Sequence, residues 1–417
     1  MSDQHALLLD RVTTCLVRET ERGLGVAVSG GSDSLALLIL LAKWGQLHGR
    51  RVKAATVDHG LRPESSDEAA LVGRLCADIG VTHDTLRWEG PQSSGNLSDQ
   101  ARRARYRLLA QWAEANEVGC VAVGHTMNDQ AETFLMRLGR EAGLDGLAAM
   151  TGHWRVGNTV FCRPALQVSR EELRDVLRAK DIKWIEDPTN TDPAYERVKA
   201  RRALEELSGL GISARNLSRV STHLAEVRTS LYWYVFLAAQ THLRFHSGDV
   251  FVARKGFRTV TRDVARRLVQ QILLWIGGAE YAPRGNAVDL MLEAIRGGTK
   301  MTLHGCVMTV MDHELHFTRE AQAVAAMRAA PGEIWDDRWV LEGPHPEGCY
   351  IAALGQKGLA HCPDWRYTGL PEQSLRAAPS VWRGGHVVAA PLAGLANGWQ
   401  ATLLRDDQQF YADVLAH

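Results

Sequence analysis

Residues 25–34 read Gly-Val-Ala-Val-Ser-Gly-Gly-Ser-Asp-Ser, and this stretch decides the fold of the N-terminal part of the chain. It begins as an apolar strand, and apolar spacing predicts a helix from Leu35 to Trp44 directly behind it. The two adjacent glycines between them let the backbone approach an anion closely, and the helix N-terminus points free N–H groups toward it. The stretch therefore predicts a phosphate-binding turn between a strand and a helix.

The polar groups of this turn are hydroxyls and one carboxylate. No Lys follows the second glycine, so the turn differs from the loops that serve γ-phosphate transfer. The hydroxyls of Ser29, Ser32 and Ser34 can cradle a pyrophosphate, and Asp33 can hold Mg²⁺. These groups suit a reaction that releases pyrophosphate and delivers AMP to a substrate. The alternative is a Ser/Gly turn that only caps an ordinary helix.

Composition bounds the class of protein. A chain of 417 residues is expected to form two or three domains. The 48 Lys and Arg residues balance the 48 Asp and Glu residues, so a nucleic acid would have to bind to local basic patches and not to an overall positive charge. The seven cysteines contain no C-x-x-C pair, so neither zinc nor an iron–sulfur cluster is indicated, and most are expected to be buried thiols. The N-terminus lacks the pattern of a signal peptide and no segment is long and apolar enough for a membrane span, so we expect a soluble, cytoplasmic protein.

Strand and helix patterns alternate in the N-terminal half. Short apolar runs predict buried strands at 24–29, 51–57, 83–88 and 118–124. Further helices are predicted between them, over Asp67–Ile79 and Leu97–Asn116. This alternation predicts an α/β fold with a doubly wound parallel sheet, and functional groups at the carboxyl ends of its strands.

The pattern changes farther along the chain. A capping-box sequence at Ser169 predicts a helix to about Ala179, and a strand-like segment follows at 182–185. Helical patterns dominate 201–240 and 262–277, and short alternating runs after Pro331 predict a small α+β module. We therefore expect domains over residues 1–210, 211–325 and 326–417.

Polar residues mark the predicted strand ends. Asp58 and His59 follow the second strand, where they can meet ribose or metal, although Asp58 can equally brace the turn. After the fourth strand, Gly124 permits a close approach of the backbone to a nucleotide, and His125 can act as a general base or a phosphate donor. Thr126 or Asn128 can cap the helix that follows.

Two carboxylates, Asp129 and Glu132, share one face of that helix because they are three residues apart. They can simply complement the helix dipole. Beside a nucleotide cleft they predict a pocket for a cation, either Mg²⁺ or the ammonium group of an amine substrate.

Two basic clusters can contact RNA or can serve only solubility. Arg102, Arg105 and Tyr106 fall on one helix face, toward the cleft or a phosphate backbone. The second cluster follows the turn at 187–190 and consists of Arg197, Lys199, Arg201 and Arg202.

The turn resembles that of the pyrophosphate-loop ATP hydrolases, also called N-type ATP pyrophosphatases, whose fold is adenine nucleotide alpha hydrolase-like. The ordered set of motifs resembles the tRNA(Ile)-lysidine synthetase family, strongly over residues 22–205 and more weakly beyond. The matching segments are 29–34, 57–62, 102–107, 124–133, Arg163-Pro-Ala-Leu166, the Ser169 helix, Trp184 and Glu186–Asn190, then Leu370-Pro371 and 379–385. One segment departs from the pattern: where the family has Arg-Asn-x-[Leu/Ile]-Arg, this chain has Val198 and Ala200 between Arg197 and Arg201.

The resemblance implies an enzyme that uses ATP and Mg²⁺ to adenylate the wobble cytidine of a CAU anticodon in isoleucine tRNA. Free L-lysine then displaces AMP and forms lysidine, which changes decoding from AUG to AUA. The middle and C-terminal modules would bind tRNA, and a homodimer is one option for the assembly. The alternatives are a tRNA thiolase, a glutamine-dependent amidotransferase or a non-catalytic tRNA-binding regulator.

The resemblance and the residue chemistry together assign roles by position. The expected ATP-binding residues are Ser29, Gly30, Gly31, Ser32, Asp33, Ser34, Asp58, His59 and Gly124. The expected catalytic residues are Asp33, His125, Arg105 and Arg201, with Asp33 also the metal ligand. Asp129, Glu132 and Arg105 are expected to bind lysine, and Arg102, Arg197 and Arg201 to contact tRNA.

Overall fold

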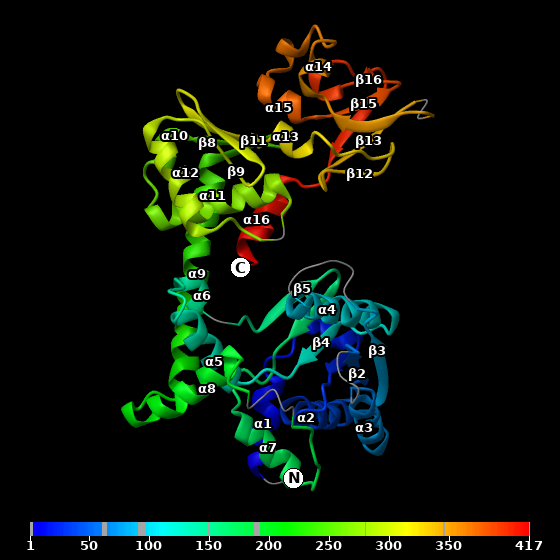
Figure 1. Ribbon diagram of the computed structural model, residues 1–417, viewed down its shortest axis with the longest axis vertical. Coiled ribbons are helices and arrows are strands. Elements are labelled where there is room, and N and C mark those ends of the chain that lie inside the picture. The colour runs from blue at the N-terminus through cyan, green and yellow to red at the C-terminus, as the bar shows by residue number, and fades with distance from the viewer. Residues whose placement is uncertain are drawn as a thin grey trace. The chain divides into compact units, whose positions relative to one another are not determined.

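The computed structural model describes residues 3–60, 65–90, 97–148, 150–186, 192–279, 281–344 and 347–416 (Figure 1). The chain forms two compact units, Met1–Arg228 and Thr229–His417, and the helix α9 (Ala214–His242) runs from one into the other. Each unit has its own sheets and its own hydrophobic cores. Within the described ranges, every helix is too short or too polar to span a bilayer.

A six-stranded sheet of order β3-β2-β1-β4-β6-β5 organises the first unit. Its strands are β1 (Leu24–Ala27), β2 (Val52–Asp58), β3 (Thr82–Arg87), β4 (Cys120–Val123), β5 (His153–Val156) and β6 (Thr159–Cys162). All neighbouring pairs are parallel except β5 with β6 at one edge. The predicted doubly wound parallel sheet is therefore confirmed, and two strands that the sequence does not predict, the parallel β6 and the antiparallel β5, extend it at one edge.

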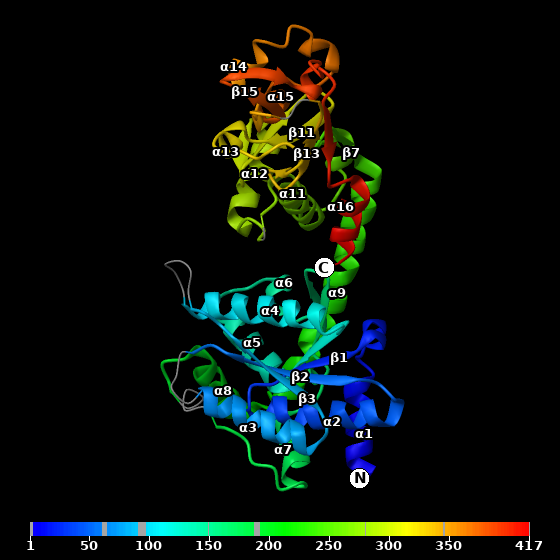
Figure 2. The same cartoon turned by 90° about the vertical axis from the view of Figure 1, so that its right-hand side faces the viewer.

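Helices cover both faces of this sheet, and Figure 2 shows α4 on one face and α2 and α3 on the other. The helices of the unit are α1 (Asp3–Thr13), α2 (Ser32–His48), α3 (Ser65–Asp78), α4 (Leu97–Ala115), α5 (Met127–Leu138), α6 (Leu144–Leu147), α7 (Arg170–Arg178) and α8 (Glu196–Leu207). Successive residues of β1 face two different cores: Val26 packs with the α2 side and Ala27 with the α4 side. Burial on both faces is the reason that these strands read as unbroken apolar runs.

The strand predicted at 182–185 is wrong. These residues form no strand, and the amide of Ile185 instead donates to the carbonyl oxygen of Gly30 (3.0 Å). Ile182 and Trp184 pack against the core, so the apolar pattern reports burial of single side chains and not a sheet. The predicted turn at 187–190, with Leu61 and Arg62 of the second motif, lies outside the described residues.

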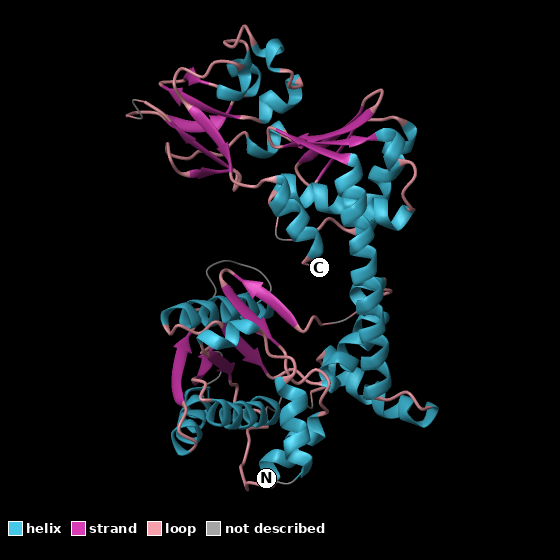
Figure 3. Cartoon of the chain, turned by 180° about the vertical axis from the view of Figure 1, so that it is seen from behind, coloured by secondary structure: helices cyan, strands magenta, loops and turns pink. Residues whose placement is uncertain are grey.

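The second unit contains more β-structure than its sequence predicts (Figure 3). An antiparallel sheet of order β7-β8-β11-β10-β9 packs against α11 and α12, and two three-stranded sheets follow in the C-terminal part. The strands are β7 (Leu243–His246), β8 (Asp249–Ala253), β9 (Met301–Leu303), β10 (Cys306–Val310), β11 (Glu314–Arg319), β12 (Ile334–Trp335), β13 (Trp339–Glu342), β14 (Tyr350–Ala353), β15 (Pro379–Arg383), β16 (His386–Ala389) and β17 (Gln400–Leu403). The helices are α10 (Arg254–Phe257), α11 (Arg262–Gly277), α12 (Gly285–Gly297), α13 (Ala321–Val324), α14 (Gly355–Leu359), α15 (Glu372–Ala377) and α16 (Asp407–Leu415).

The helical patterns predicted for 201–240 and 262–277 correspond to α8, α9 and α11. The division into compact units falls inside α9, whereas the domain boundaries predicted from sequence, after residues 210 and 325, stay a prediction.

Candidate active site

The turn between β1 and α2 opens into a cavity of about 830 Å³ in the first unit. The cavity lies where β1 and β4 end, at the carboxyl edge expected of a doubly wound sheet. It is lined by these predicted site residues: Ser29, Gly31, Ser32, Asp33, Ser34, Arg105, Gly124, His125, Asp129, Glu132, Arg197 and Arg201. Four other predicted residues, Gly30, Asp58, His59 and Arg102, do not line it.

The side chain of Ser34 closes the turn. Its hydroxyl oxygen accepts from the amide of Ser29 (3.1 Å) and donates to the carbonyl oxygen of Gly31 (3.0 Å). The amides from Gly30 to Asp33 donate to no acceptor in the described part of the chain, because the first amides of a helix have no partner within it. Gly31, Ser32 and Asp33 line the cavity, so the turn supplies free amides and hydroxyls there, which is the arrangement that a phosphate chain needs.

Two glycines of the site are required by close packing. Gly30 has a φ of +81°, and a Cβ there would lie 2.6 Å from Cδ1 of Ile185. A Cβ on Gly124 would lie 3.0 Å from the backbone nitrogen of Ser34. Gly124 thus lets the end of β4 pack against the first turn of α2, and this packing explains the glycine without reference to a nucleotide.

Helix α5 carries the two carboxylates and begins with a capping box. Thr126 is the N-cap, and Oδ2 of Asp129 accepts from both its amide (2.8 Å) and its hydroxyl (2.7 Å). Asn128 is not the cap, since its side-chain oxygen accepts from the amide of Arg170 (2.9 Å). Glu132 is only 1% exposed, and its Oε2 is buried with no hydrogen-bond partner among the described residues. Asp129 therefore serves the helix and the cavity together, whereas Glu132 serves only the cavity.

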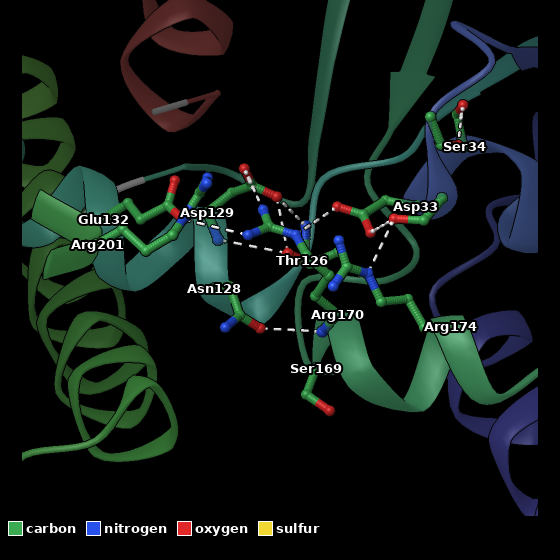
Figure 4. Close-up of polar contacts among 12 residues, drawn as sticks. Asp33, Ser34, Thr126, Asn128, Asp129, Glu132, Ser169, Arg170, Arg174 and Arg201 are labelled. Carbon is green, nitrogen blue, oxygen red and sulfur yellow. Dashed lines mark hydrogen bonds and ion pairs between the residues drawn. The ribbon is translucent and has the colours of Figure 1, made fainter. Parts of the chain in front are cut away.

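Arg170 joins the carboxylates of the two halves of the site, and sequence reasoning missed it (Figure 4). Its guanidinium lies 3.0 Å from Oδ2 of Asp33, 3.3 Å from Oδ1 of Asp129 and 3.4 Å from Oε1 of Glu132. A second cation, Arg201 from α8, lies 3.0 Å from the same oxygen of Glu132.

The position of Arg170 carries a signal that could have revealed it. Arg170 is the first residue of α7, where the helix dipole disfavours a cation, directly after the N-cap Ser169. The three carboxylates compensate this unfavourable position.

Burial and ion pairing leave the pKa values of Asp33 and Asp129 shifted in opposite directions. Burial raises the pKa of Asp33, and pairing with Arg170 offsets only part of this rise. Burial also acts to raise the pKa of Asp129, but Arg170 and the hydrogen bonds from Thr126 outweigh it, so this pKa is lowered. The cavity therefore holds a firmly ionised carboxylate on α5 and a more easily protonated one on the turn.

His125 is neutral in this environment. Burial lowers its pKa to about 3, and the nearby charge of Asp129 opposes this only in part. Its Nδ1 accepts from Nε of Arg163 (3.2 Å), so the remaining proton of the neutral ring is on Nε2. This favours a hydrogen-bond donor to phosphate over a general base.

The low pKa of His125 predicts a loss of stability in acid. Between a pKa of about 3 in the folded chain and about 6.5 in an unfolded one, only the unfolded chain binds the proton. The contribution of His125 to the free energy of unfolding therefore decreases as the pH is lowered, by up to about 1.4 kcal/mol for each pH unit. We expect His125→Gln, which keeps an acceptor for Arg163, to lose less stability than the parent chain between about pH 6.5 and about pH 4.5.

Denaturant unfolding at the two pH values measures this difference, and His48→Gln, at an exposed position, is the control. Equal acid losses in the parent chain and in His125→Gln would contradict the prediction.

The residues outside the cavity have structural partners. Oδ1 of Asp58 accepts from the amide of Gly60 (2.9 Å), and a hydrogen bond from Ser65 lowers the pKa of Asp58. Asp58 therefore braces its turn, and its predicted role in ATP binding stays a prediction. His59 meets the edge of Trp88, with ring centroids 5.8 Å apart.

The two arginines of the predicted basic stripe on α4 lie in different surroundings. Arg102 lies over the ring of Tyr106, 5.3 Å from its centroid, while Arg105 lines the cavity. In the second cluster, Arg197 and Arg201 line the cavity and Lys199 and Arg202 do not. Val198, which stands where the related family has Asn, is among the lining residues. Arg174 of α7 also lines the cavity and was not predicted.

None of the described residues that line the cavity is a cysteine. Five of the seven cysteines are buried, as predicted: Cys76, Cys120, Cys162, Cys306 and Cys362.

Comparison with known proteins agrees with this geometry. A family model described as the PP-loop domain matches residues 6–207, the span that contains the turn and every residue lining the cavity. The chain is 50% identical over 396 residues to the tRNA(Ile)-lysidine synthase of Ruegeria pomeroyi. The matched residues cover 95% of this chain and 94% of that protein. It is 40% identical over 296 residues to that of Hyphomonas neptunium, covering 68% of this chain and 78% of that protein. For that of Wolbachia pipientis the identity is 31% over 379 residues, with 88% of each chain covered. The chain belongs to the tRNA(Ile)-lysidine synthase family.

Proposed function

We propose that this chain joins lysine to the wobble cytidine in the CAU anticodon of isoleucine tRNA and converts ATP to AMP and pyrophosphate. The names of the curated relatives support the overall reaction. The observation that carries the assignment to this site is Arg170, which bridges the phosphate-type turn and the α5 carboxylates within one cavity. A nucleotide and an amine can therefore be bound side by side.

In the first step, the carbonyl oxygen of the cytosine ring forms a bond to the α-phosphorus of ATP, and the bond from that phosphorus to the β-phosphate oxygen breaks. The free amides of the turn and the hydroxyl of Ser32 bind the phosphates, and Nε–H of His125 is available as a further donor. Arg174, whose Nε lies 3.5 Å from the Ser32 hydroxyl oxygen, adds positive charge beside the departing pyrophosphate.

In the second step, the ε-amine of lysine forms a bond to the ring carbon that carries the adenylate. The bond from that carbon to the AMP oxygen breaks, AMP leaves with that electron pair, and the nitrogen gives up its extra protons to the carboxylate of Glu132 and from there to water in the cavity. Glu132 is the preferred partner of the ammonium group, because its Oε2 is buried and has no partner among the described residues. Asp129 adds a second negative charge nearby, and Arg105 is suited to the lysine carboxylate.

Mg²⁺ fits the same site. Mg²⁺ is commonly held by one or two carboxylates together with phosphate oxygens. Asp33 and Asp129 both direct a carboxylate oxygen to Arg170, and the described residues contain no group of three or more ligands that would hold a metal without a nucleotide. Asp33, with Asp129 beside it, would hold the ion, and the bound ion would neutralise charge on the pyrophosphate.

Transfer of labelled lysine tests the proposal. The purified chain is incubated with ATP, Mg²⁺, labelled L-lysine and a CAU-anticodon isoleucine tRNA, and label on the tRNA is measured. We expect incorporation that depends on ATP and is absent from the same tRNA with a GAU anticodon. Folded protein that puts no label on the CAU tRNA would exclude the proposed function.

A further inference from the structure

A second cavity, in the second unit, is bordered by arginines. It has a volume of about 340 Å³ and lies between α10, the start of α11 and the end of α12. Arg254, Arg258, Arg262 and Arg296 line it, and no carboxylate is among the described residues that do so. On a chain with a formal net charge of zero, this is a local concentration of positive charge that the composition does not require.

Two of these arginines have a polar partner, and only one of those partners is a carboxylate. Arg262 pairs with Oδ1 of Asp289 (2.9 Å), and Arg254 donates to the carbonyl oxygen of Met311 (3.4 Å). The side chains of Arg258 and Arg296 are exposed and have no hydrogen-bond or ion-pair partner among the described residues.

The floor of this cavity is apolar. Phe257, Leu292 and Ile295 line it and are each less than one tenth exposed. An apolar floor beneath a cationic rim suits a ligand with an anionic group and a flat, weakly polar body. A nucleotide has both, and RNA-binding surfaces combine arginines on phosphates with apolar or aromatic contacts to bases.

We propose that this arginine-rimmed cavity binds one unpaired nucleotide of the tRNA, with Arg258 and Arg296 on backbone phosphates and the apolar floor against the base or ribose. This inference rests on the proposed function, because it takes tRNA as the substrate. RNA is favoured over a free nucleotide because the cations come from three separate segments, so they can meet more than one phosphate of a continuous backbone.

The test is the salt dependence of tRNA binding by the full chain and by the double variant Arg258→Ala/Arg296→Ala. We expect the slope of log Kd against log salt concentration to become less steep by about 2, and tRNA binding to weaken roughly tenfold at moderate salt. The KM for tRNA should rise with kcat unchanged, since neither arginine lines the active-site cavity. The control is Arg50→Ala/Arg74→Ala, at exposed positions outside both cavities.

The outcomes separate the two proposals. If the parent chain neither binds the CAU tRNA nor transfers lysine to it, the proposed function fails. If the parent chain does both and the Arg258/Arg296 variant keeps its salt slope, only the nucleotide site is overturned. Calorimetric titration with AMP gives a third outcome: if the parent chain binds a second AMP besides the one in the active-site cavity, and the variant loses only that second AMP with an unchanged tRNA slope, the arginine-rimmed cavity binds a free nucleotide and the RNA site is overturned.

Discussion

Asp33→Asn is expected to lower the rate of pyrophosphate release roughly 100- to 1,000-fold, because it removes the only carboxylate of the phosphate-binding turn. Asn keeps the size of the side chain and an oxygen that can accept from the Ser32 hydroxyl, which lies 3.0 Å from Oδ1 in the parent chain. The change is therefore one of charge: the turn loses the proposed ligand for Mg²⁺ and the ionised partner of Arg170.

Pyrophosphate release is measured with ATP, Mg²⁺ and CAU tRNA in the absence of lysine, so that only the first step is observed. Asp10→Asn, at an exposed position of α1, is the control and should release pyrophosphate at the parental rate. The Asp33 assignment is wrong if Asp33→Asn, shown to be folded by its unfolding curve, releases pyrophosphate as fast as the parent chain. Asp33→Ala should be at least as slow as Asp33→Asn.

Glu132→Gln is expected to separate the two steps of the reaction. It should raise the KM for lysine roughly 10- to 150-fold, the cost of losing a hydrogen bond to a charged group, while pyrophosphate release changes much less. The physical reason is the buried Oε2, which has no partner among the described residues and is the best-placed acceptor for an ammonium group.

Glu132 is a sharper test than its neighbour Asp129. Asp129 also caps α5 by accepting from the amide and hydroxyl of Thr126, so Asp129→Asn would disturb the start of the helix as well as the site. Glu132 makes no capping bond, and Gln preserves an acceptor for Arg170 and Arg201. Glu114→Gln, at an exposed position on α4, serves as the control. Equal losses in both steps would refute the assignment of Glu132 to the amine.

Local patterns predicted the first unit well, because the elements that build its site are coded by neighbouring residues. The apolar runs of β1 and β4 reflect strands buried on both faces, and the helix behind the turn follows from its own periodicity. The capping box predicted at Ser169 likewise depends on residues only three apart, whereas the choice between Thr126 and Asn128 as the cap of α5 was left open by the sequence.

Patterns that depend on distant partners were interpreted less well. The segment 182–185 has the composition of a strand, but it does not pair with any strand of the sheet. Ile185 instead contacts Gly30 of the phosphate-binding turn. The sheet β7-β8-β11-β10-β9 was not predicted because its strands are short, three to six residues each, and α11 and α12 interrupt them in the sequence.

By itself the sequence determined the phosphate-type turn, the parallel sheet around it and the family resemblance, since glycine conformation and apolar periodicity act over a few residues. Only the tertiary structure decided which charges meet. Asp33 and Arg170 are 137 residues apart, yet they form an ion pair that also draws in Asp129 and Glu132. Coulomb attraction depends on distance in space, and that distance is set by the packing of α2, α5 and α7 at the end of the sheet.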